Sequence, residues 1–162
     1  MIRITKFEPL SREWLFFMDN SQIISQLADE LRAEFANEST GHDWFHIERV
    51  WKNARYICEK EGGNLFLTEL AALLHDIADH KFVVNADEVA AMRITSILSK
   101  WNMDQEIISK VIDIVKHNSF KGGLENKMTI KEGFFVQDAD RLDAIGAIGI
   151  ARTFAYGGKA GS

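Results

Sequence analysis

The sequence is poor in cysteine and proline, and it lacks the long apolar runs of membrane proteins. Its 162 residues include a single cysteine, Cys58, so no disulfide can form within the chain and a reducing compartment is expected. The first residues lack the apolar stretch of a signal peptide, and no run reaches the roughly 18 apolar residues that a membrane span requires. The net charge of −5 argues against the basic surface that nucleic-acid binding usually requires. We therefore expect a cytoplasmic protein that engages neither membranes nor nucleic-acid polymers.

Helices dominate the apolar pattern. Pro9 is the only proline, so nothing after it forces a helix to break. From about residue 21 onward, apolar residues recur at the spacing of amphipathic helices. Two glycines and an asparagine at residues 62–64 mark a break, and residues 134–153 are predicted to form one long helix. The sequence predicts an all-α bundle of about six helices, divided into an N-terminal segment packed on the body (1–20), the main domain (21–158) and a short tail (159–162).

Histidine and aspartate occur where the helical spacing calls for apolar residues. His46 lies on the same predicted helix face as Val50, the pair His75-Asp76 ends an apolar helix, and Asp140 lies on the apolar side of the last long helix. Buried ionisable groups are costly unless they are paired or bind a metal. Three helices that send such groups inward can form a cation site inside a bundle. Spacing alone leaves hydrogen-bonded core residues as an open alternative.

Three segments resemble the HD-domain phosphohydrolases, whose pattern is a histidine, a later His-Asp pair and a distant aspartate. The segments are residues 41–50, 73–77 and 138–146, and the match runs in order over about residues 22–157. Carried over residue by residue, the resemblance implies that one divalent metal ion is held by His46, His75, Asp76 and Asp140. This mixed nitrogen and oxygen ligand set favours Mn²⁺, Fe²⁺, Co²⁺ or Ni²⁺ over Mg²⁺ or Ca²⁺.

The same segments are similar to a bacterial subgroup that includes nucleoside triphosphate pyrophosphohydrolases acting on deoxynucleotides. The resemblance implies metal-dependent hydrolysis of a phosphate ester or anhydride in a (deoxy)nucleotide, with pyrophosphate released from a triphosphate as the specific prediction. A nucleoside monophosphate phosphatase and a non-catalytic sensing module are the alternatives. Hydrolysis of guanosine tetraphosphate is disfavoured, because Asp79-His80 stands where those relatives have Glu-Asp.

Several further polar residues are candidates for catalysis, substrate binding or support. In several related enzymes an acid at the position of Asp79 acts as general acid or base, so we expect Asp79 to orient or deprotonate the attacking water; helix capping is the alternative. Asp143 is interpreted as an ion-pair partner of Arg49 or Arg141, with orientation of a metal ligand as the alternative. Three residues are candidate substrate contacts, with capping or surface roles equally open: His42, Lys81 and His117.

The chain is short for this subgroup, whose members usually continue for several tens of residues beyond the glycines at 157 and 158. This sequence stops at Ser162. An apolar face left uncovered on the last helix would favour self-association. On this basis we expect a homodimer. The alternative is a substrate pocket left incomplete, which would impair the activity of this chain.

Overall fold

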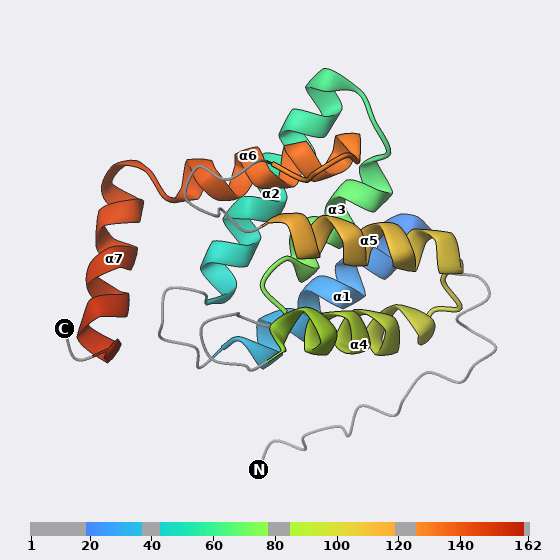
Figure 1. Cartoon of the computed structure of the whole chain (residues 1–162), viewed down its shortest axis with the longest axis horizontal. Helices are drawn as coiled ribbons and strands as arrows, with labels where there is room; N and C mark the ends of the chain where they lie inside the picture. The colour runs from blue at the N-terminus through green and yellow to red at the C-terminus, as the bar shows by residue number, and fades with distance from the viewer. Residues whose placement is uncertain (1–18, 37–42, 78–84, 119–125, 161–162) are drawn as a thin grey trace, which may run out of the picture.

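In the computed structural model, helices pack around a central helix (Figure 1). The structure describes residues 19–36, 43–77, 85–118 and 126–160. These ranges contain seven helices and no strand: α1 Asn20–Glu34, α2 Trp44–Glu61, α3 Leu65–Leu74, α4 Ala86–Ser99, α5 Gln105–Asn118, α6 Lys131–Asp143 and α7 Gly146–Ala160. The predicted all-α class is confirmed. None of these helices combines the length and apolarity needed to cross a membrane.

Several predictions fall on parts of the chain that the structure does not describe. They concern the N-terminal segment up to residue 18 and the end of the tail at 161–162. They also concern three of the candidate site residues: His42, Asp79 and Lys81. The roles assigned to these residues stay predictions.

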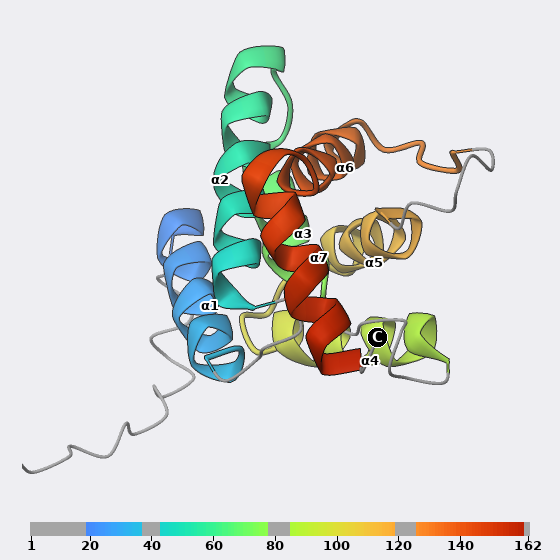
Figure 2. The same cartoon turned by 90° about the vertical axis from the view of Figure 1, so that its left-hand side faces the viewer.

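Helix α3 lies at the centre of the bundle (Figures 1 and 2). Residues 67–74 are all buried, because α3 packs against α1, α2, α5 and α6. Burying a leucine side chain such as Leu70 or Leu73 stabilises a fold by about 1.5–3 kcal/mol. The apolar run that ends at Leu74 therefore carries the next residue, His75, into the interior, where it is 6% exposed.

The two ends of α2 follow from its sequence. Asp43 is the N-cap, and its carboxylate accepts a hydrogen bond from the backbone N–H of His46 at 2.9 Å, a contact worth about 1 kcal/mol. At the other end Gly62 adopts φ of 70°, a left-handed conformation that glycine tolerates. Asn64 then caps α3 by accepting from the N–H of Leu67. The predicted break at residues 62–64 is confirmed.

The prediction of one helix over residues 134–153 is wrong, because the chain turns between α6 and α7. Gly146 adopts φ of 68°, and a Cβ on Gly149 would lie 2.2 Å from the carbonyl oxygen of Ala144. The first turn of α7 thus sits directly on the end of α6. Apolar residues continue on both sides of this turn, so periodicity does not reveal it. As a result α7 lies at one side of the bundle and packs on α6 (Figures 1 and 2).

Candidate metal centre

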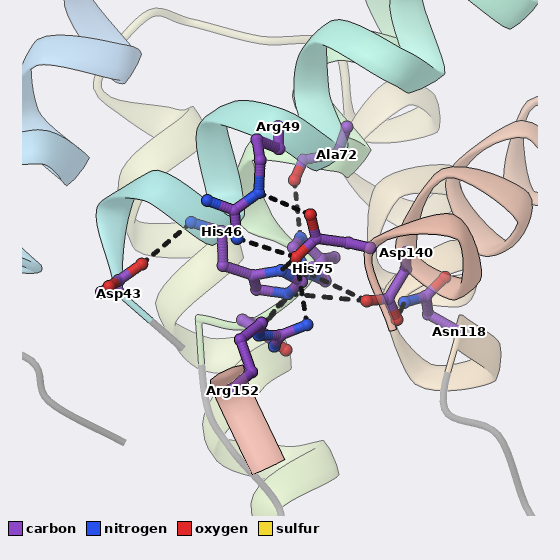
Figure 3. A network of polar contacts seen from close by, with 10 residues as sticks. Asp43, His46, Arg49, Ala72, His75, Asn118, Asp140 and Arg152 are labelled. Atoms are coloured by element: carbon purple, nitrogen blue, oxygen red, sulfur yellow. Dashed lines mark hydrogen bonds and ion pairs between the residues drawn. The ribbon is translucent and has the colours of Figure 1, made fainter. Parts of the chain in front are cut away.

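The predicted ligands converge between α2, α6 and the C-terminal end of α3 (Figure 3). Ligand atoms of His46, His75 and Asp140 all lie within 4.8 Å of one another. The Nε2 atoms of His46 and His75 are 3.1 Å apart, and Asp140 Oδ1 lies 3.5 Å from His46 Nε2. Asp76 Oδ2 lies 3.2 Å from the Nε2 of His46 and 3.5 Å from that of His75. The packing of three helices thus brings all four predicted residues together.

The other nitrogen of each imidazole faces a hydrogen-bond acceptor. His46 Nδ1 lies 2.7 Å from Asp143 Oδ2, and His75 Nδ1 lies 2.7 Å from the carbonyl oxygen of Ala72. An ionised carboxylate and a carbonyl can only accept, so each neutral ring carries its proton on Nδ1. Both Nε2 atoms then present lone pairs to each other, with carboxylate oxygens beside them. This donor set calls for a cation, and a divalent metal ion fits it.

The surroundings of His46 favour positive charge at that position. Burial alone lowers the pKa of its imidazole, which is 1% exposed, but hydrogen bonds with Asp143 and Asp76 outweigh burial. The pKa of His46 therefore lies above its ordinary value in the absence of a metal. A proton and a metal ion compete for the same Nε2 lone pair. The carboxylates that attract a proton to His46 also attract a metal ion.

Asp143 supports His46 from the side opposite the cluster. Arg49 donates to it in a fork, from Nε to Oδ1 at 2.6 Å and from Nη2 to Oδ2 at 3.0 Å. Arg152 donates from Nη1 to Oδ2 at 3.1 Å. Burial raises the pKa of the Asp143 carboxyl, but hydrogen bonds from His46 and Arg49 hold that pKa well below its usual range. Of the two arginines predicted as partners, Arg49 is the one found here, and the carboxylate fixes the His46 ring as well.

Two residues beside this centre were not predicted from the sequence. Asn118 donates from Nδ2 to Asp140 Oδ2 at 3.2 Å, and so helps to hold that carboxylate. Arg152 reaches the centre from α7, beyond the turn that the sequence did not reveal (Figure 3). The neighbouring His117 directs its Nδ1 to the Asp113 carbonyl oxygen of its own helix, at 3.0 Å. Contact between His117 and a substrate stays a prediction.

Comparison with known proteins identifies the same family that the sequence motifs resemble. The sequence model of the HD domain matches residues 44–145, the segment that contains the four converging residues. The Bacillus subtilis (strain 168) protein YpgQ is 41% identical over 138 residues, which cover 84% of this chain and 67% of YpgQ.

Several solved structures resemble this one, among them two from Bacillus species. The crystal structure of Bacillus subtilis YpgQ in complex with ADP has a TM-score of 0.65 at 42% identity, over 83% of this chain and 69% of that chain. An HD-superfamily hydrolase from Bacillus thuringiensis has a TM-score of 0.69 at 39% identity, over 88% of this chain and 69% of that chain. This chain thus spans about two thirds of the length of these relatives.

Proposed function

This chain belongs to the HD-domain family and is a metal-dependent phosphohydrolase, and we propose that it hydrolyses a nucleotide. The specific reaction proposed is release of pyrophosphate from a deoxynucleoside triphosphate. The observation that supports it most directly is the pair of imidazole Nε2 atoms, 3.1 Å apart, with carboxylate oxygens beside them. The ADP complex of YpgQ supports a nucleotide as the ligand.

The proposed ligands of a single divalent ion are His46, His75, Asp76 and Asp140. Two nitrogen and two oxygen donors suit Mn²⁺, Fe²⁺, Co²⁺ or Ni²⁺ better than Mg²⁺ or Ca²⁺. When bound, such an ion supplies Lewis-acid stabilisation of charge on a phosphate oxygen and makes a nearby water more acidic.

The protein's own groups position the reactants. Asp143 and the carbonyl of Ala72 hold the two imidazoles with their Nε2 lone pairs directed into the cluster, and Asn118 holds Asp140. Asp79 is proposed to orient the attacking water or take its proton. Substrate contacts are proposed for the three residues named from the sequence: His42, Lys81 and His117.

A nucleotide panel with identification of the phosphate product tests the reaction. Pyrophosphate together with a nucleoside monophosphate is the expected result with a triphosphate substrate. Orthophosphate released from a monophosphate would instead establish the rival phosphatase activity. Purified protein that retains no metal by elemental analysis and hydrolyses no nucleotide would contradict the proposal and favour a sensing module.

Asp76→Ala tests the ligand assignment. The variant is expected to lose both bound metal and turnover, because it removes a carboxylate oxygen 3.2 Å from His46 Nε2. Asp138→Ala is the matched control, since the Asp138 side chain is 61% exposed on α6 and pairs with Arg141. The control is expected to keep both properties. Undiminished turnover in the Asp76 variant would refute the assignment.

A further inference from the structure

Asn118, the last residue of α5, is a buried amide with one side-chain partner in the described part of the chain. Its Nδ2 donates to Asp140 Oδ2 at 3.2 Å (Figure 3), and the residue is 6% exposed. Its Oδ1 is buried and accepts no hydrogen bond from the described residues. Buried polar atoms without a partner cost free energy and are rare in native proteins. The reason for an asparagine at this position therefore has to come from its contact with Asp140.

Asp140 fixes the orientation of this amide. With the amide reversed, Asn118 Oδ1 would face Asp140 Oδ2, and both atoms are acceptors. A leucine has the same branching at Cγ and would bury no polar atom at this position. Packing alone would thus favour an apolar residue, whereas the amide N–H of Asn118 serves the carboxylate.

Another buried amide joins α5 to α6 beside this contact. Gln137, which is 1% exposed on α6, donates from Nε2 to the carbonyl oxygen of His117 at 2.7 Å. Its Oε1 accepts from Asn126 Nδ2 at 2.9 Å. Gln137 lies three positions before Asp140, so both side chains share a face of α6. Gln137 thus holds the end of α5, and the Asn118 amide is left to act on Asp140.

The two oxygens of Asp140 face different neighbours. Oδ1 lies 3.5 Å from His46 Nε2 and 4.0 Å from His75 Nε2, whereas Oδ2 accepts from Asn118. The Asp140 side chain is 32% exposed, and among the described residues it is Asn118 that holds Oδ2. A carboxylate can bind a cation through one oxygen or through both. The hydrogen bond from Asn118 keeps Oδ2 turned towards α5 and so favours ligation through Oδ1 alone.

We propose that Asn118 is a positioning residue that makes Asp140 a one-oxygen ligand of the metal ion. This inference rests on the proposed function, because it assumes a divalent ion bound in the cluster. An ion held through one oxygen of Asp140 keeps a position that the second oxygen would otherwise fill. Catalytic metal sites need such a position for water or for a substrate oxygen. Asn118 thus keeps the centre open for the reactants.

The test counts the water molecules that exchange at Mn²⁺ in the full chain, with the metal alone as the probe. Protons of water bound to Mn²⁺ relax rapidly, so the relaxation rate of the bulk water reports how many molecules exchange at the ion. Asn118→Leu removes the donor to Asp140, which frees Oδ2 to bind the ion. We expect this variant to retain bound Mn²⁺ and to lose one exchanging water molecule per ion relative to the wild type.

Asn64→Ala serves as the control for loss of stability. Asn64 caps α3 at the end opposite His75, where it accepts a hydrogen bond from the N–H of Leu67. Removing this cap is expected to lower Tm and to leave the number of exchanging water molecules unchanged. Destabilisation alone therefore does not reproduce the effect expected for Asn118→Leu. Asn118→Val keeps the proposal testable if leucine fits poorly, since valine is smaller and also lacks a donor.

Two outcomes would overturn the inference. One is wild-type water exchange in an Asn118 variant that retains Mn²⁺, because Oδ2 would then stay off the ion without its partner. The other is loss of Mn²⁺ from both Asn118 variants at saturating metal, because Asn118 would then be needed to hold the ion itself.

The two proposals fail in different ways. If the wild-type protein hydrolyses a nucleotide but water exchange is unchanged in the Asn118 variants, the role of Asn118 is wrong and the proposed function stands. If Asn118→Leu loses an exchanging water molecule but the wild type hydrolyses no nucleotide, the proposed function is wrong and the role of Asn118 stands. A wild-type protein that binds no Mn²⁺ contradicts both.

Discussion

Replacing Asp143 by asparagine separates support of the metal centre from metal ligation. Asparagine keeps the shape of aspartate, but its NH₂ group must take one of the two oxygen positions. At Oδ1 it would face Arg49 Nε, and at Oδ2 it would face His46, Arg49 and Arg152, all of which are donors. Breaking a buried ion pair costs about 3–5 kcal/mol. Because the Arg49 side chain is 33% exposed, we expect the lower end, about 3 kcal/mol.

Two measurements detect the effect of Asp143→Asn, one on stability and one on metal affinity. About 3 kcal/mol corresponds to a fall of about 6–12 °C in the Tm of a domain of this size. Competition with a chromogenic chelator is expected to show metal affinity weaker by about 10- to 100-fold, the usual effect of losing the carboxylate behind a ligating histidine. Asp138→Asn, with its carboxylate 61% exposed on the same helix, is expected to change stability by less than about 0.5 kcal/mol. Wild-type metal affinity in a folded Asp143→Asn protein would refute the reasoning.

Two further predictions concern α7. Gly149→Ala is expected to lower Tm, because the new Cβ meets the Ala144 carbonyl, whereas Gly158→Ala has open space and should stabilise the helix by up to about 1 kcal/mol. Thermal melts compare them, and a higher Tm for Gly149→Ala would exclude the close approach. Phe154→Ser is expected to weaken self-association, since Phe154 is 77% exposed. Sedimentation velocity measures it, and identical profiles for variant and wild type would remove Phe154 from any interface.

The fold class could be predicted from the sequence because helical spacing is a local pattern. The same spacing singled out the four converging residues, whereas their assignment as metal ligands came from the resemblance to the HD-domain family. Helical spacing marks the buried faces, and His46 is as deeply buried as its predicted neighbours Val50 and Ala54. The His75-Asp76 pair follows an apolar run that has to lie in the core. A polar residue at such a position contradicts the apolar pattern around it, and that contradiction is visible without coordinates.

The turn between α6 and α7 could not be predicted from the sequence in the same way. The residues around it, including Ile145 and Ile148, continue an apolar helical pattern, although both are exposed in the structure. The break depends on a positive φ at Gly146 and on the absence of a side chain at Gly149. A glycine within an apolar run is compatible with a helix interior as well as with a turn. The contact between Arg152 and Asp143 depends on this turn, so it was missed as well.

The support of His46 follows from a spacing that repeats on two helices. Arg49 lies three positions after His46 on α2, and Asp143 lies three positions after Asp140 on α6, so each pair shares a helix face. When α2 packs on α6, His46 meets both aspartates and Arg49 meets Asp143. The contacts that orient the ligand are therefore also contacts that join α2 to α6. Metal binding and the packing of these helices should then stabilise each other, because both need the same position of the His46 ring.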